Sequence, residues 1–291
     1  MDIYQHITDR IIAALETGKK TGEKLWNGAG ESAGLPINYS TQRAYTGINV
    51  LILWDAARRN WFSSNAWLTY KQAADLGGQV RQGEKAELGI FFKPLEKAAV
   101  NTDTGEVEHD RIPMLKAFYL FNLDQVDGVD RPATVAPNEF TAIENAERVL
   151  QMSGARITIG GTQAFYRRSD DTIHLPDKYR FAKAENFYAV ALHELTHWSG
   201  GGSRLNREFG ARFGDEAYAF EELVAEIGSA FLNAELGFID ATLENHASYV
   251  DSWLTVLKRD KKAIVSAAAL AAKAHQYIMG LVTPTPQEVA A

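Results

Sequence analysis

The chain has 291 residues, enough for two domains with separate cores, and 46 % hydrophobic with 23 % charged residues is ordinary for a soluble globular protein. No apolar run reaches the roughly 18 residues that a membrane helix needs, and the start lacks secretory-signal features, so we expect a cytoplasmic protein outside the membrane. The net charge of −7 argues against bulk attraction to nucleic acid. The absence of cysteine leaves His, Asp and Glu as ligands for any zinc.

The pattern of the first half predicts an α+β domain. Ile7, Ile11, Ile12 and Leu15 recur at helical spacing, which predicts a helix over residues 3–18 that ends at Gly18. Further along the chain we expect two short helices, at 48–60 and 68–78, and two strands, at 86–95 and 115–126, joined by a polar loop at 102–110.

A turn-rich, proline-containing stretch at 126–140 separates the two halves. We therefore predict a first domain over 1–128, a linker over 129–140 and a second domain over 141–291. The second domain is expected to begin with a helix and a small sheet, with strands at 155–160 and within 164–176, where "RSDD" indicates a hairpin turn. From Ala184 to Tyr277 it is expected to be helical.

The segment "AVALHELTHWSG", residues 189–200, contains the HExxH arrangement. Residues four apart share one face of a helix, so His193 and His197 can bind a single ion, with Glu194 beside them. A catalytic zinc lowers the pKa of its water to about 7, and Glu194 would act as the general base. The alternative is that the two histidines only line a core.

The third ligand is sought in "YAFEELVAEIGSAFLNAELG", because no HxxGxxH continuation follows the motif. Glu222 and Glu226 lie together beside the apolar stripe of this predicted helix, whereas Glu221 is expected to point elsewhere. We assign Glu222 as ligand and Glu226 as the partner of a ligating histidine. Exchanged roles, solvated glutamates, or His246 and His275 as ligands remain alternatives.

A zincin also needs an oxyanion donor and an edge strand on which an extended substrate can lie. Tyr218 and Tyr249 are candidate donors, although a packing role is the alternative for both. The segment "DDTIHLP", residues 170–176, is the expected edge strand, and its His174 is interpreted as a surface or packing residue.

The motifs "FYRRSDDTIHLP", "ALHELTHWSGGGSRLNR" and "FGDEAYAFEELVAEIGSAFL" resemble the zincin-type metallopeptidase domain of ArdC-type antirestriction proteins. In the first half, "DIYQHITDRIIAALETG", "LPINYSTQRAYTGINVLILW" and "FYLFNLDQVDG" are similar to the N-terminal domain of that family. The resemblance runs from residue 2 to about 280. One difference lies at 23–30, "EKLWNGAG", where only Trp26 remains of the family's tryptophan–proline pair.

The resemblance implies a plasmid-type protein that binds single-stranded DNA through its N-terminal domain and protects incoming DNA from host restriction. It also implies a SprT/Spartan-like domain in which His193, His197 and a glutamate of "EELVAE" hold Zn²⁺, or another divalent metal such as Mn²⁺. DNA-associated proteins would be its substrates. The rival hypotheses are a DNA-coating protein with a purely structural metal and a metallopeptidase without a DNA role.

Binding of single-stranded DNA needs aromatic side chains on which bases stack and cationic side chains that contact phosphates. Aromatic and basic residues alternate in several segments of the first half. Packing inside the domain is the alternative for most of these aromatic residues. The candidate DNA-binding residues are Arg43, Tyr45, Arg58, Arg59, Trp61, Trp67, Tyr70, Lys71, Arg81 and Lys85.

Overall fold

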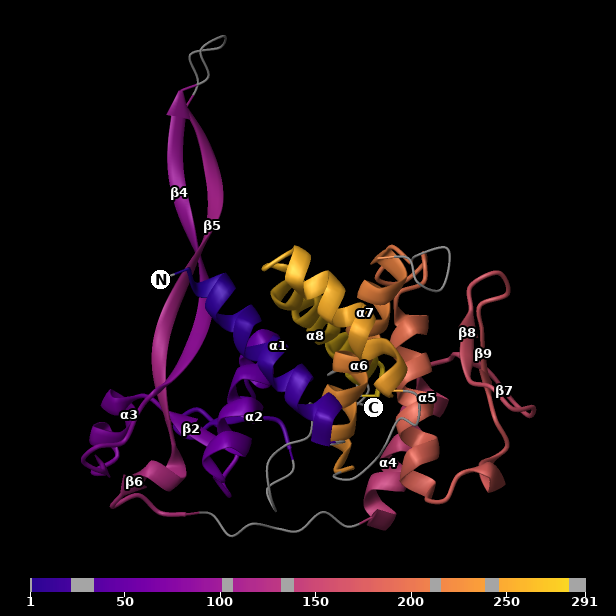
Figure 1. Ribbon diagram of the computed structural model, residues 1–291, viewed down its shortest axis with the longest axis horizontal. Coiled ribbons are helices and arrows are strands. Elements are labelled where there is room, and N and C mark those ends of the chain that lie inside the picture. The colour runs from indigo at the N-terminus through magenta and orange to yellow at the C-terminus, as the bar shows by residue number, and fades with distance from the viewer. Residues whose placement is uncertain are drawn as a thin grey trace, which may run out of the picture.

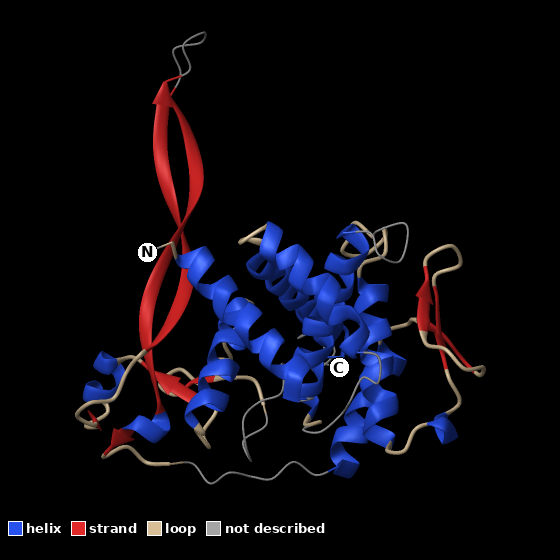
Figure 2. Ribbon diagram, in the orientation of Figure 1, coloured by secondary structure: helices blue, strands red, loops and turns tan. Residues whose placement is uncertain are grey.

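Helices form the middle of the molecule, and small sheets lie at its two ends (Figures 1 and 2). A computed structural model describes residues 2–21, 34–100, 107–131, 139–209, 216–238 and 246–282. Trp26 and most of the predicted linker, residues 132–138, lie outside this part of the chain. Within it, no helix has both the length and the apolar character that crossing a bilayer requires.

The N-terminal helices pack against the first sheet. Helix α1 spans Ile3–Thr21, so the predicted end at Gly18 is wrong. A glycine within a helix costs only about 1 kcal/mol, and Lys19 and Lys20 in the last turn suit the negative end of the helix dipole. Helix α2 spans Ile48–Asn60, as expected from the sequence. Helix α3 spans Tyr70–Asp75, shorter than the predicted 68–78, because Leu68 belongs to a strand and Thr69 caps the helix.

A long two-stranded arm leaves this end of the molecule (Figure 1). Strands β4, Glu87–Val100, and β5, Val107–Asn122, pair in antiparallel register. Strand β4 runs five residues past its predicted end, whereas β5 begins eight residues before its predicted start and ends at Asn122, short of the predicted 126. Residues 107–110 therefore belong to β5 and not to the expected loop. With β1, Ile37–Asn38, and β2, Ala66–Leu68, they form a sheet of order β1-β2-β5-β4. A separate pair joins β3, Gln79–Val80, to β6, Val126–Asp127.

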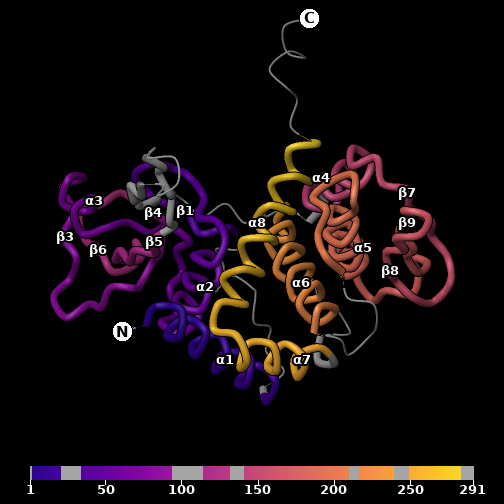
Figure 3. The backbone as a smooth tube through the Cα atoms, turned by 90° about the horizontal axis from the view of Figure 1, so that it is seen from above, coloured from indigo at the N-terminus to yellow at the C-terminus, as the bar shows by residue number. Residues whose placement is uncertain are grey.

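The second sheet lies at the opposite end of the molecule, beyond helices α4 and α5 (Figure 3). Helix α4 spans Glu139–Met152, and the strands are β7, Arg156–Ile159, β8, Phe165–Arg167, and β9, Thr172–Leu175. The predicted hairpin is confirmed, since β8 and β9 pair in antiparallel fashion. The sheet order is β7-β9-β8, so β9 is central and the expectation that residues 170–176 form an edge strand is wrong. Among the described strands, β7 and β8 form the two edges of this sheet.

In the described residues between 184 and 282 there are four helices, which correspond to the predicted helical region. They are α5, Ala184–Ser199, α6, Glu216–Leu236, α7, His246–Arg259, and α8, Ala263–Val282. Helix α6 packs against both α5 and α8. Its buried side chains join a core that also holds residues of α1 and α2, and Phe231 meets Trp54 edge-to-face at 5.9 Å between ring centroids. One apolar core therefore connects the N-terminal helices to the second half of the chain.

Candidate metal centre

Helix α5 holds two histidines on one buried face. His193 and His197 are one turn apart, and their ring centroids lie 4.8 Å from each other. Leu192 and Leu195 of the same helix are fully buried in the core of the second half, which fixes the rotation of α5 about its axis. The histidines therefore face α6 and not solvent.

A residue without a side chain lets α6 approach α5. A Cβ atom at Gly228 of α6 would lie 2.6 Å from Cγ2 of Thr196 on α5, closer than real Cβ atoms come to any neighbour. Thr196 itself is fully buried and donates its hydroxyl to the Leu192 carbonyl. The close helix contact thus depends on glycine at position 228.

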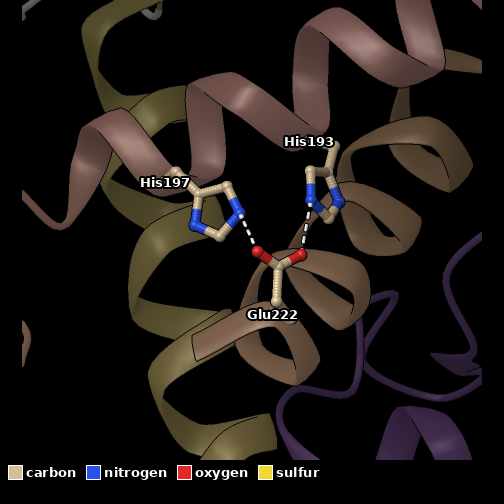
Figure 4. A group of neighbouring side chains, drawn as sticks. All are labelled: His193, His197 and Glu222. Atoms are coloured by element: carbon tan, nitrogen blue, oxygen red, sulfur yellow. Dashed lines mark ion pairs between the residues drawn. The ribbon is translucent and has the colours of Figure 1, made fainter. Parts of the chain in front are cut away.

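Glu222 of α6 reaches both imidazoles (Figure 4). Its Oε2 lies 3.4 Å from Nε2 of His193, and its Oε1 lies 3.6 Å from Nε2 of His197. His193, His197 and Glu222 each offer one potential metal-ligand atom, and these three atoms lie within 4.8 Å of one another. Two imidazoles and one carboxylate are the protein ligands of a zincin-type site, so the side chains fit a divalent cation.

The other ring nitrogens face two further carboxylates of α6. Glu221 Oε1 lies 3.2 Å from Nδ1 of His197, so the expectation that Glu221 points elsewhere is wrong. Glu226, the expected partner of a ligating histidine, has Oε2 3.7 Å from Nδ1 of His193. The His193 Nδ1 atom is buried without a hydrogen-bond partner among the described residues. Consecutive glutamates thus contact opposite nitrogens of His197.

Arg207 anchors Glu221 from the loop that follows α5. Its Nε donates to Glu221 Oε2 at 3.0 Å and a terminal nitrogen donates to Oε1 at 2.7 Å. The same guanidinium donates to the Thr196 carbonyl at 2.7 Å. A Cβ atom at Gly200 would lie 2.8 Å from the guanidinium carbon, so a larger residue there would displace the Arg207 side chain from this position. The sequence interpretation missed Arg207 because nothing in its spacing links it to Glu221.

Burial and charge set the protonation of the cluster. Burial raises the pKa of Glu194 above its ordinary value, although the two imidazoles oppose the shift. Burial also disfavours the ionised form of Glu222, but its contacts with His193 and His197 outweigh burial and hold its pKa far below the usual range. For His197, the carboxylates of Glu221 and Glu222 overcome burial and raise the pKa to about 10.

The other candidate ligands lie elsewhere. His275 pairs with Glu235 through Nε2 at 2.6 Å, and His174 stacks on Phe165 at 4.6 Å between ring centroids. The side chain of His246 is outside the described part of the structure. Neither described histidine joins the cluster of His193, His197 and Glu222.

Tyr218 and Tyr249, the candidate oxyanion donors, flank the carboxylate ligand. Their ring centroids are 6.4 Å apart. Burial raises the pKa of Tyr218, and its contacts with Tyr249 and Glu222 raise it further, so its hydroxyl keeps its proton at neutral pH. Tyr218 is thus a protonated hydroxyl beside the cluster, in contact with Tyr249 and Glu222.

The predicted DNA-binding residues do not form one surface. Trp67 is 1 % exposed and packs in the core, so its assignment as a stacking platform is wrong. Tyr45 is half-buried and accepts a hydrogen bond from Asn38. Three of the arginines form ion pairs with acidic side chains. Arg58 and Arg59 pair with Asp55, and Arg81 pairs with Glu84. The exposed members of the set are Arg43, Arg59, Trp61, Tyr70, Lys71, Arg81 and Lys85.

The sequence interpretation missed three further exposed aromatic residues. Phe91 and Phe92 of β4 are 44 % and 48 % exposed, and Tyr119 of β5 is 62 % exposed. An aromatic-rich strand usually indicates a core strand. Here these rings stay exposed although Leu88 and Ile90 of the same strand β4 are buried in the core with α1 and α2.

Comparison with known proteins identifies the family. Residues 1–121 match the N-terminal domain of anti-restriction factor ArdC, and residues 144–270 match a zincin-like metallopeptidase. The antirestriction ArdC protein from plasmid R388, whose metal-free crystal structure is known, shares 38 % sequence identity with this chain. The match covers 97 % of this chain and 98 % of the R388 protein, and the two structures superpose with a TM-score of 0.79. The chain belongs to the ArdC family. The expected two-domain α+β architecture is thereby confirmed.

Further relatives of this ArdC-family chain differ in length. The Mn(II)-bound R388 ArdC structure is 37 % identical, with a TM-score of 0.78 and coverage of 97 % and 99 % of the two chains. The uncharacterized protein y4eC of Sinorhizobium fredii is 38 % identical over 93 % of this chain and 89 % of its own length. A DNA primase TraC of Escherichia coli is 38 % identical over 98 % of this chain, which spans only 28 % of that primase.

The contact between Glu221 and His197 predicts an effect on metal affinity. Glu221→Gln keeps the side-chain volume but removes the charge that orients the His197 ring, so divalent-metal affinity should fall by about tenfold. Competition titration of Mn²⁺ and Zn²⁺ with a chromogenic chelator measures this. Glu235→Gln, on the same helix but paired with His275, is the matched control. Equal affinities of both variants and the unmodified protein would contradict the role of Glu221.

Proposed function

We propose that this ArdC-family protein binds single-stranded DNA, protects incoming DNA from host restriction, and carries a metal-dependent peptidase site that acts on proteins bound to that DNA. The buried donor set of His193, His197 and Glu222, with Glu194 between the histidines in sequence, is the observation that supports it most. Membership of an antirestriction family supplies the biological setting.

His193, His197 and Glu222 would hold the divalent ion, Zn²⁺ or the Mn²⁺ found in the R388 relative. When bound, such an ion supplies Lewis-acid chemistry, because it withdraws charge from water and from a carbonyl oxygen. Glu194, with its pKa raised by burial, is suited to take a proton from that water and deliver it to the leaving amine. The Tyr218 hydroxyl can donate to the oxyanion of the tetrahedral intermediate.

The free edge of β8 provides a place for an extended substrate. Among the described residues, strand β8 pairs only with β9, and the Tyr166 backbone of β8 donates a hydrogen bond to Glu194. A peptide that adds a strand at this edge would lie beside the Glu194 carboxylate. Edge-strand binding reads backbone more than side chains, so we expect broad sequence tolerance in the protein substrate.

Trp61 supports single-strand binding by the first half. It ends α2 in the left-handed conformation, with φ of 56°, and its side chain is 92 % exposed. A bulky residue in this conformation is strained, and an exposed ring contributes little to a core. Tyr70 and Tyr119, at 55 % and 62 % exposure, offer further rings for base stacking. Strain without a packing benefit is typical of a binding residue.

The first prediction from this proposal concerns Trp61. Glycine adopts the left-handed conformation without strain, so Trp61→Gly should leave the free energy of unfolding unchanged or raise it by up to about 1 kcal/mol. Loss of one stacked base should weaken single-strand affinity by about 5- to 150-fold. Fluorescence anisotropy with a labelled oligonucleotide, beside chemical denaturation, measures both quantities. Unchanged affinity would remove Trp61 from the DNA surface.

The second prediction concerns Glu194. Metal-loaded protein incubated with single-stranded DNA and an added DNA-binding protein should cleave that protein, whereas Glu194→Gln should be slower by about 100-fold or more with metal binding retained. Gel analysis with single-stranded, duplex and no DNA follows the cleavage. Equal rates for Glu194→Gln and unmodified protein would contradict the assigned base.

The rival hypotheses have distinct outcomes in the same experiments. Full protection of DNA from restriction by Glu194→Gln, with no cleavage by either protein, would favour a DNA-coating protein with a structural metal. Cleavage that proceeds equally without DNA, together with no oligonucleotide binding at low salt, would favour a peptidase without a DNA role.

A further inference from the structure

The small sheet beside the metal cluster is basic although the protein is acidic. Residues 155–183 contain six Lys and Arg residues against three Asp residues, a net charge of +3 in a chain of −7. These residues include all three strands of the sheet β7-β9-β8. Positive charge is therefore concentrated at the end of the molecule that borders Glu194.

One face of this sheet is not covered by the core. Ile173 and Leu175 of β9 point inward and are buried against the helices, with exposures of 0 % and 1 %. Alternation then places His174 on the outer face, in register with Thr158 of β7 and Phe165 of β8. Figures 1 and 3 show helices on the inner side only and the sheet at the margin of the molecule.

Arginines flank this row on the same outer face. Arg156 of β7 and Arg167 of β8 both pair in register with Thr172 of the central strand. Both arginines are exposed. A carboxylate oxygen of Asp170 lies 3.6 Å from Arg167, and Arg156 donates a hydrogen bond to the Asp170 carbonyl oxygen at 3.2 Å. Thr172 between them is 5 % exposed. Two cations thus border the central strand of the uncovered face.

The aromatic residues of this face form an ordered stack. The rings of Phe165 and His174 lie 4.6 Å apart at an interplanar angle of 21°. The Arg167 guanidinium lies 5.4 Å from the Phe165 ring centroid and 2.6 Å from His174 Nε2. Phe165 remains 39 % exposed, so it presents an open ring to solvent. Rings with adjacent guanidinium groups are the chemistry that binds bases and phosphates of a single strand.

We propose that the outer face of the sheet β7-β9-β8 is a second contact site for single-stranded DNA, located on the peptidase domain itself. This inference rests on the proposed single-strand binding and adds a site to it. Tyr166, whose backbone contacts Glu194, lies between Phe165 and Arg167 on β8. Single-stranded DNA bound to Phe165 and Arg167 would lie one residue away from Tyr166, at the edge of β8 where a protein substrate would bind. The site thereby selects proteins that are bound to DNA.

A double variant tests the charge on this face. Arg156→Gln/Arg167→Gln should bind a labelled single-stranded oligonucleotide about tenfold more weakly at low salt. Its slope of log affinity against log salt should be shallower by about 1.4, because each lost phosphate contact removes about 0.7. Phe165→Ala should weaken binding at least about fivefold. Lys258→Gln/Lys261→Gln removes the same charge from exposed positions at α7 and the turn after it, and should behave like unmodified protein.

Photo-cross-linking of an oligonucleotide containing 5-iododeoxyuridine locates the contact directly. Adducts on the tryptic peptide Ile157–Arg167 are expected. If the protein binds the oligonucleotide but the arginine variant matches the lysine control, and all adducts fall within residues 34–131, the sheet site is wrong and the proposed function stands. No binding of unmodified protein at low salt would instead reject single-strand binding itself.

Discussion

The close packing of α6 on α5 is the constraint on which the site depends. Gly228 permits the helices to approach at Thr196, and the approach brings three carboxylates of α6 around two imidazoles of α5. Each histidine then faces Glu222 with Nε2 and another glutamate with Nδ1. In a buried site these contacts set the orientation of both rings before any ion binds.

Helix α6 also connects the site to the rest of the protein. Leu223, Ile227 and Phe231 belong to the core shared with α1 and α2, whereas Leu232 and Leu236 belong to the core around α4 and α5. The same helix therefore contributes to both cores and carries the carboxylates of the cluster. Under the proposed function, a first half that binds DNA and is joined to the metal site in this way would raise the effective concentration of DNA-bound proteins at that site.

The sequence was sufficient for features that depend on local spacing. The i, i+4 histidines, the helical region from Ala184 and the β8–β9 hairpin follow from periodicity and turn chemistry, and the structure contains each of them. Glu221 could not be assigned because consecutive helix positions differ by about 100° in direction, and only the angle of the partner helix shows that a ring lies between Glu221 and Glu222. The order β7-β9-β8 involves parallel pairing of β7 with β9, which no local pattern reveals. Burial of Trp67 and exposure of Trp61 likewise depend on contacts distant in sequence.

Anomalous diffraction from crystals soaked in Mn²⁺ tests the central claim, a single metal centre built by α5 and α6. The account predicts one strong peak per chain, bonded to Nε2 of His193, Nε2 of His197 and a carboxylate oxygen of Glu222. A peak with Glu221 or Glu226 in place of Glu222, or no peak at the cluster, would contradict it.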